Sequence, residues 1–150
     1  MAFLSSFDIC ASGLSAQRLR MDIASENVSN IDTTRTEAGG AYRRKLVVFE
    51  SYGSGSSFRE AMRNAAQGKG INVRACGVRV ADIVEDDREM KMVYNPEHPD
   101  ADESGFVEMP NVDLLKETAD AMSATRSYDA NVTALNAMKL MAQKALEIGK

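Results

Sequence analysis

Residues 3–31 read FLSSFDICASGLSAQRLRMDIASENVSNI, and their apolar positions recur at alternating intervals of four and three. This spacing places apolar side chains on one stripe of a helix that packs lengthwise against a partner. Gly13 within the stretch indicates a neighbour that approaches the helix closely. Asn30 and the polar residues after it predict the end of the helix. The stripe consists of Phe3, Phe7, Cys10, Leu14, Gln17, Met21, Ala24, Val28 and Ile31.

The same spacing returns at the other end of the chain, over residues 112–148. A helix of that span is roughly 55 Å long, which is more than one small core can cover. We therefore expect part of its surface to meet other chains. Asn111 or Asp113 can cap its first turn. The second stripe consists of Leu114, Glu117, Ala121, Ala124, Tyr128, Asn131, Leu135, Met138, Ala142 and Ala145.

Strand-like runs occupy the middle of the chain. Residues 42–50 combine three basic residues, interpreted as solubilising side chains, with an apolar second half. Residues 71–84 alternate on either side of Gly77, which predicts a bulge or a bend. Residues 90–94 predict a further short strand.

Turn-forming residues separate these runs. Residues 51–70 are rich in Ser and Gly and predict a flexible segment. Pro96, Pro99 and Pro110 favour an extended chain up to the second long helix.

Together these patterns predict an α+β fold in three parts. Residues 1–34 form an N-terminal helix, and residues 35–110 form a small β-rich central region that includes the flexible segment. Residues 111–150 form a C-terminal helix that packs with the first helix as in a coiled coil.

Charge is unevenly distributed along the chain. The formal net charge of −4 disfavours a nucleic-acid backbone as a partner. Residues 43–79 carry eight basic and two acidic side chains, a net charge of +6. Residues 80–113 carry two basic and eleven acidic side chains, a net charge of −9. The two segments pair either within one subunit or in a head-to-tail contact between subunits, and the sequence leaves both open.

The sequence offers no convincing catalytic or metal-binding constellation. His98 is the only histidine, and no nucleophile motif accompanies it. Residues 100–105 resemble the start of a calcium loop, but Asn111 stands where the closing glutamate belongs. Cys10 and Cys76 do not suggest a disulfide framework. We therefore expect no enzymatic activity, no metal site and no cofactor.

Membrane insertion is not indicated either. The first residues lack a basic region followed by a continuous apolar run, so no cleavable secretory signal is predicted. The longest strand-like apolar run is far too short to cross a bilayer.

The residues carry a family resemblance. Residues 11–45, ASGLSAQRLRMDIASENVSNIDTTRTEAGGAYRRK, resemble the flagellar rod and hook proteins of bacteria. NVSNIDTT, residues 27–34, is similar to a motif of that family in which two asparagines precede a threonine. Ser29 departs mildly from it, because the family commonly has Ala there. Residues 94–112 and 127–150 are similar to the proximal-rod members.

This resemblance implies a structural subunit of the flagellar proximal rod. The terminal helices would line the inner wall of a hollow helical rod that transmits torque and forms the export channel. The implied location is the basal body, in the rod within the periplasm, after export through the flagellar type III apparatus. Implied partners are the other proximal-rod proteins, the distal rod protein, the adaptor between rod and membrane ring, and further copies of the chain. A coiled-coil adaptor that does not polymerise is the alternative.

The two stripes and the motif together predict an assembly interface. For each of its residues the alternative is packing within its own subunit. The predicted interface residues are Leu14, Met21, Asn27, Val28, Ile31, Leu114, Tyr128, Leu135 and Met138.

Overall fold

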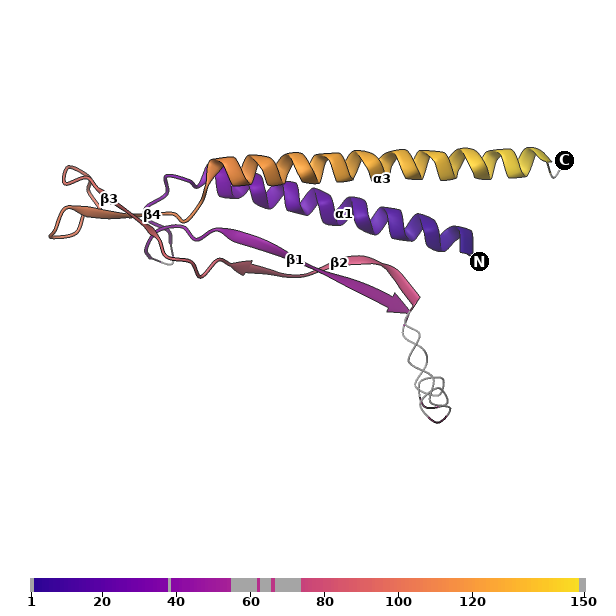
Figure 1. Cartoon of the computed structure of the whole chain (residues 1–150), viewed down its shortest axis with the longest axis horizontal. Coiled ribbons are helices and arrows are strands. Elements are labelled where there is room, and N and C mark those ends of the chain that lie inside the picture. The colour runs from indigo at the N-terminus through magenta and orange to yellow at the C-terminus, as the bar shows by residue number, and fades with distance from the viewer. Residues whose placement is uncertain (1, 38, 55–61, 63–65, 67–73, 149–150) are drawn as a thin grey trace.

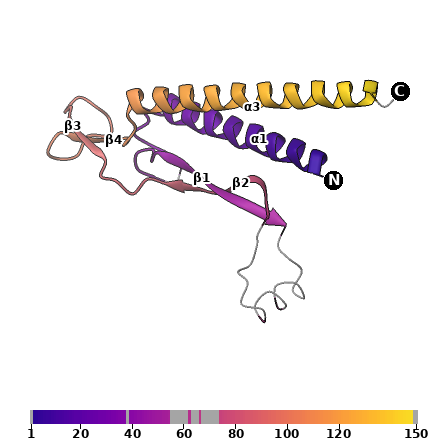
Figure 2. The same ribbon diagram turned by 45° about the vertical axis from the view of Figure 1, so that its right-hand side comes forward.

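The computed structural model shows an elongated α+β molecule, as the sequence predicts. Two long helices, α1 (Ala2–Ser29) and α3 (Leu114–Ile148), run antiparallel side by side, with two β-ribbons between them in the chain (Figure 1). The helices are closest where α1 ends and α3 begins, and they diverge toward the two termini (Figure 2). The structure describes residues 2–37, 39–54, 62, 66 and 74–148.

α1 ends because Asn30 binds back onto its last turn. The backbone N–H and the Nδ2 of Asn30 both donate to the carbonyl oxygen of Glu26, at 3.1 and 2.9 Å. The hydroxyl of Thr33 donates to Asn30 Oδ1 at 3.2 Å. The predicted helix therefore extends two residues too far, and Ile31 lies in the turn that follows α1.

α3 begins at a side-chain cap. Asp113 Oδ1 accepts a hydrogen bond from the backbone N–H of Leu115 at 3.1 Å, which satisfies one of the free donors of the first turn. Of the two predicted caps, Asp113 therefore holds that position. Asn111 binds elsewhere in the chain.

The two helices approach closely at Gly13, as the sequence indicates. A Cβ atom at this position would lie 3.0 Å from Asn131 Nδ2 on α3. Burial along the pair is dominated by small residues, because Ala24 on α1 and Ala124 on α3 are both buried. The contact between the helices is therefore close but shallow.

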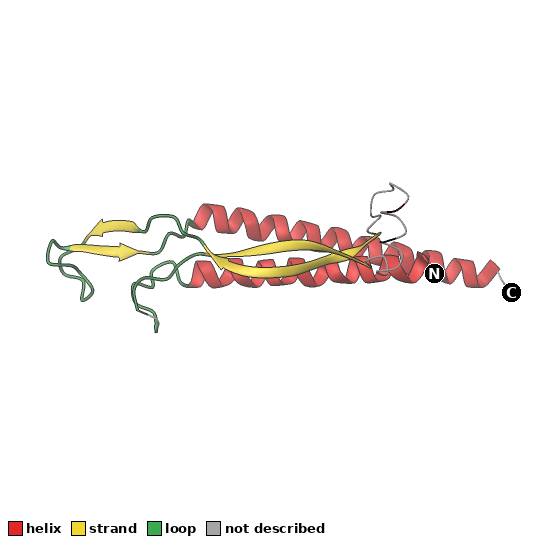
Figure 3. Ribbon diagram, turned by 90° about the horizontal axis from the view of Figure 1, so that it is seen from below, coloured by secondary structure: helices red, strands yellow, loops and turns green. Residues whose placement is uncertain are grey.

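The first ribbon pairs β1 (Lys45–Ser54) with β2 (Arg74–Glu85) in antiparallel register and runs alongside the helix pair (Figure 3). The register shifts between Tyr52 and Gly53, opposite Gly77, so the predicted bulge is confirmed. Most of the predicted flexible segment lies outside the described residues, but its first four residues belong to β1.

Gly77 brings the first ribbon against α1. Its φ is 149°, and a Cβ atom there would lie 2.4 Å from the hydroxyl oxygen of Ser12. That hydroxyl accepts a hydrogen bond from the backbone N–H of Val78 at 3.1 Å and donates to the carbonyl of Ile9 at 2.7 Å. The bulge thus fastens β2 to the side of α1.

The second ribbon, β3 (Lys91–Tyr94) and β4 (Phe106–Met109), lies beyond the junction of the helices (Figure 3). β3 matches the predicted short strand, whereas β4 was not predicted. The expectation that prolines keep the chain extended is wrong for Pro96 and Pro99, which lie in turns, whereas Pro110 directly follows strand β4. The chain reverses direction, with the backbone N–H of Asn95 donating to the carbonyl of Gly105 at 2.9 Å.

Candidate assembly site

Asn27 is the centre of a buried polar cluster at the junction of all the elements. Its side chain is 1% exposed and uses all four of its hydrogen-bonding positions. Nδ2 donates to the carbonyl of Lys45 and to Glu117 Oε2, both at 2.9 Å. Oδ1 accepts from the backbone N–H of Lys45 at 2.9 Å and from the Tyr42 hydroxyl at 3.0 Å. One carboxamide therefore joins α1, the start of β1 and the first turn of α3.

Arg44 supplies the positive charge of the same cluster. Its Nε donates to Glu117 Oε1 at 2.6 Å, and its terminal nitrogens lie 3.4 Å from Asp120 and 3.7 Å from Asp86. Arg44 and Glu117 are both buried, and a buried charge is costly unless an opposite charge pairs with it. Asp120 also binds Arg20 at 2.9 Å.

Asn111 completes the cluster. Its Oδ1 accepts from the backbone N–H of Arg44 at 2.9 Å, and its Nδ2 donates to the carbonyl oxygens of Asp86 and Arg88 at 3.0 and 3.2 Å. The chain just before α3 is thus held against the residues that precede β1 and follow β2. The polar junction is defined as Asn27, Tyr42, Arg44, Asp86, Asn111, Glu117 and Asp120.

The electrostatics of the polar junction act on Tyr42. Burial, followed by the carboxylates of Glu26, Glu117 and Glu85, raises the pKa of Tyr42 to about 12. Both causes disfavour the phenolate, since it would be poorly solvated and would face like charges. The hydroxyl therefore stays protonated and can donate to Asn27.

The polar junction also answers part of the charge question. Arg44 belongs to the basic segment and Asp86 to the acidic segment, and the two pair within the chain. The basic segment also pairs internally, because Arg79 binds Glu50 at 2.9 Å across the first ribbon.

Sequence reasoning missed Arg44. Its basic neighbours suggested a solubilising side chain, but Arg44 is only 8% exposed, so that interpretation is wrong for this residue. A signal was present in Glu117, the one charged residue of the predicted stripe on residues 112–148. A carboxylate that a helix buries requires a cation or several donors from another element.

The structure places the predicted interface residues in different environments. Asn27 is buried in the polar junction, and Met21 accepts a hydrogen bond at Sδ from the Thr125 hydroxyl at 3.3 Å. These two contact α3 within their own chain. Leu114 is 49% exposed. The half-buried remainder consists of Leu14, Val28, Ile31, Tyr128, Leu135 and Met138.

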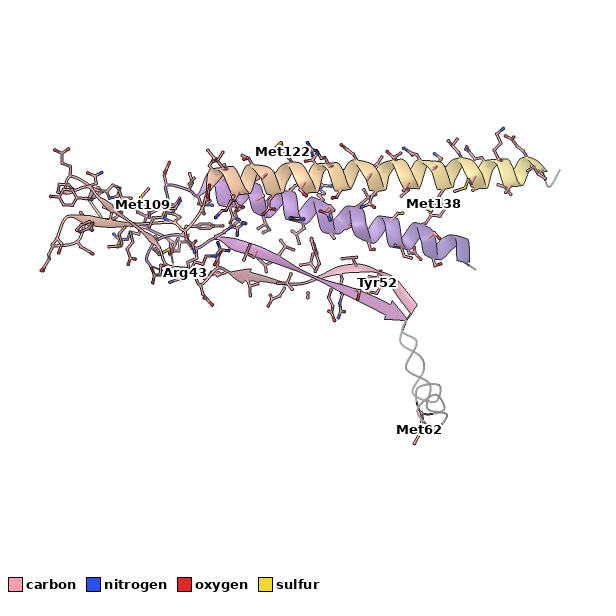
Figure 4. All side chains as sticks on the ribbon, in the orientation of Figure 1. Arg43, Tyr52, Met62, Met109, Met122 and Met138 are labelled. Carbon is pink, nitrogen blue, oxygen red and sulfur yellow. The ribbon has the colours of Figure 1, made fainter. Side chains whose placement is uncertain are left out.

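α3 also carries an outer stripe, on the face turned away from α1, which differs from the stripe predicted from the sequence. Figure 4 shows Met122 on the side of α3 away from α1 and Met138 on the side toward it. Positions four and three apart from Met122 are all exposed, and the large apolar ones among them are 57 to 86% exposed. The outer stripe consists of Leu115, Ala119, Met122, Arg126, Ala130, Thr133, Ala137, Leu140, Lys144 and Ile148.

The last turns of α3 extend past the beginning of α1 (Figure 1). From residue 139 to residue 148 only Ala142 is half-buried, and the other residues are exposed. Leu146 and Ile148 are 75 and 86% exposed. A helix end that exposes large apolar side chains in this way is typical of a surface that a partner covers.

Within the described residues, no group of three or more His, Cys, Asp or Glu side chains is arranged to hold a metal ion. No helix among those residues has both the length and the apolar character required to span a bilayer. The buried side chains of the polar junction bind one another, so this site joins the elements of the chain.

Comparisons with known proteins agree with this reading. A model of the flagella basal body rod protein family matches residues 7–35, and a model of the C-terminal region of flagellar basal body rod FlgEFG proteins matches residues 103–148. The first match contains most of α1, and the second contains β4 and α3.

Full-length relatives carry the same name. The chain is 47% identical to the flagellar basal-body rod protein FlgC of Bacillus subtilis over 154 residues, covering 100% of both chains. It is 41% identical to FlgC of Borreliella burgdorferi, covering 99% of this chain and 98% of the relative. It is 40% identical to FlgC of Salmonella typhimurium over 150 residues, covering 100% of both chains. The chain therefore belongs to the FlgC family of flagellar basal-body rod proteins, whose members are structural subunits of the rod.

Proposed function

We propose that this rod subunit polymerises with the other proximal-rod proteins into a hollow shaft that transmits torque and encloses an export channel. Its partners would be further copies of the chain, the other proximal-rod proteins, the distal rod protein and the adaptor between rod and membrane ring. It would act mechanically and without catalysis.

The observation that carries this proposal is the outer stripe of α3 together with its projecting end. Burying a large apolar side chain stabilises a contact by roughly 1.5–3 kcal/mol. Leu115, Met122, Leu140 and Ile148 are mostly exposed in the isolated chain, so this free energy is available only on assembly. Burial of these α3 side chains by neighbouring subunits would then drive assembly.

The proposed location is the part of the rod that lies in the periplasm. Secretion through the flagellar type III apparatus, without a cleavable signal, would bring the subunit there. Two marginal helical termini suit this route, because they leave little stable structure to unfold before export.

Leu140→Asp tests the proposal. Leu140 is 61% exposed, so the variant should keep its secondary structure, whereas a charge in a covered contact is costly. We expect loss of motility and at least about a tenfold loss of the protein from purified basal bodies, since an unpaired buried charge costs several kcal/mol.

Asn136→Asp is the matched control. It introduces the same charge at an exposed position on the same helix, outside both the outer stripe and the projecting end, and it should assemble normally. Normal motility and normal basal-body content in Leu140→Asp would contradict the proposal. Absence of the unmodified protein from basal bodies would instead favour an adaptor that does not polymerise.

A further inference from the structure

The apolar part of the contact between α1 and α3 is shallow, so it resists the sliding of one helix along the other less than an interdigitated contact would. It includes Gly13 and the buried alanines Ala24 and Ala124. Two long side chains of α1, Arg20 and Met21, also reach α3, where they bind Asp120 and Thr125. A stripe spaced by fours and threes also repeats after seven residues. A slide of seven residues would therefore keep the two stripes facing each other, although Tyr128 would take the place of Ala121 and Asn131 that of Ala124.

The polar junction behaves differently because its partners are unique. Asn27 uses four hydrogen bonds, and Glu117 Oε2 accepts one of them while its Oε1 binds Arg44. A slide of seven residues moves Glu117 by roughly 10 Å along the axis, which breaks every one of its contacts. It would also leave Arg44 without its closest carboxylate.

Buried ion pairs of this kind are weak evidence of stability. Replacing such a pair by apolar residues of similar volume is often neutral or stabilising, because removing two charges from water is costly. Buried polar groups in helix pairs are better known for selecting one register among several.

We propose that the polar junction is a register lock, in which Asn27, Arg44 and Glu117 position α3 at a single point along α1. The lock determines how far the end of α3 projects past α1, and thus where its exposed apolar residues stand. This role concerns the isolated chain and does not depend on polymerisation.

The test measures register directly, by the distance between spin labels in the full-length chain. Labels replace Ser25 on α1 and Thr133 on α3, which are both exposed, in a background where Cys10 and Cys76 are changed to serine. One register gives one distance. A slide by seven residues adds a second distance, because the labels shift by about 10 Å along the axis.

The decisive variant is Arg44→Met with Glu117→Leu. It removes both partners of the central pair, while Asp120 keeps Arg20 and Asp86 keeps Arg88 at 3.2 Å. We expect a helical protein with a second label distance. The matched control is Arg79→Met with Glu50→Leu, an exposed ion pair on the first ribbon, and it should keep one distance.

Two further variants test the proposal if the Arg44→Met/Glu117→Leu protein does not fold. Glu117→Gln keeps the shape and an acceptor for Asn27 but loses the charge, and it should show the second distance at a lower fraction. Ala124→Gly weakens the helix contact with the lock intact, and it should keep one distance. A single native distance in Glu117→Gln, or in a folded Arg44→Met/Glu117→Leu protein, overturns the proposal, as does a second distance in Ala124→Gly.

Discussion

At the scale of single residues, the polar junction depends on complete satisfaction of a few side chains. Asn27 has no free donor or acceptor, and the Tyr42 hydroxyl is one of its four partners. A half-satisfied cluster would make the fold less stable than an apolar cluster would. Each buried polar group left without a partner lowers the free energy of unfolding by about 1–3 kcal/mol. Tyr42 therefore links the protonation state of one phenol to the packing of three elements.

The raised pKa of Tyr42 predicts a loss of stability in alkali. The folded chain holds the phenol proton up to about pH 12, whereas a model tyrosine releases it near pH 10.0. The stabilisation is complete below pH 10 and is lost as the pH rises from 10 toward 12, since the unfolded state then binds fewer protons. Urea unfolding between pH 8.5 and about 11.5 should show this decline.

Tyr42→Phe removes the titrating phenol. Between pH 8.5 and about 11.5, the free energy of unfolding of this variant should decline by about 1–2 kcal/mol less than that of the unmodified chain. Tyr94→Phe is the matched control, because Tyr94 is 65% exposed. Equal pH profiles for the unmodified chain and Tyr42→Phe would show that the phenol does not contribute.

At the scale of elements, the helices could be predicted from the sequence and the ribbons only in part. The helical stripes are long, and Asn30 and Asp113 mark where α1 ends and α3 begins. The presence and the boundaries of both helices therefore follow from nearby residues. β4 was missed because the reversal before it relies on Gly105, at a φ of 79°, and on a hydrogen bond from Thr34 to Asp100 at 2.8 Å. No local pattern contains that second contact.

The candidate site follows the same division. The motif indicated Asn27, whose carboxamide binds the backbone of Lys45. Its bond to Glu117 and the burial of Arg44 arise only when α3 is placed against the first ribbon. Three adjacent basic residues look alike in a sequence, and the fold decides which one is buried.

The bulge at Gly77 predicts the sensitivity of the first ribbon to one methyl group. Gly77→Ala should lower the free energy of unfolding by about 2 kcal/mol, because its Cβ meets Ser12 in a backbone conformation that favours glycine. Chemical denaturation measures this directly. Gly39→Ala is the control for strain without a clash, since Gly39 has a φ of 86° and no atom within 4 Å of the added Cβ, and it should lose only about 1 kcal/mol. Equal losses in the two variants would show that contact with Ser12 is unimportant.

At the scale of the whole molecule, the buried side chains named above are concentrated at the end where α1 finishes and α3 begins. The polar junction and the buried apolar residues Val107 and Val112 lie where the helices meet the ribbons. Toward the termini the helices diverge, and the end of α3 has little cover (Figures 1 and 2). Isolated helical segments with little tertiary packing are marginal in water.

The isolated chain should therefore contain less helix than the 28 residues of α1 and the 35 residues of α3. We expect far-UV circular dichroism to show a deficit, and hydrogen exchange to show fast exchange near both termini and slow exchange around Asn27 and Glu117. Addition of a helix-stabilising alcohol should recover helix content. A fully helical monomer that resists proteolysis to its ends would mean that the two helices stabilise each other without a partner.

The antiparallel pairing of the first and last elements has a consequence for synthesis. Asn27 and Glu117 are 90 positions apart in the chain, and Arg20 and Asp120 are 100 positions apart. A ribosome therefore releases α1 long before the residues that bury it exist, and high contact order delays folding further. The nascent chain therefore stays without the contact between its first and last helices until its final third is made.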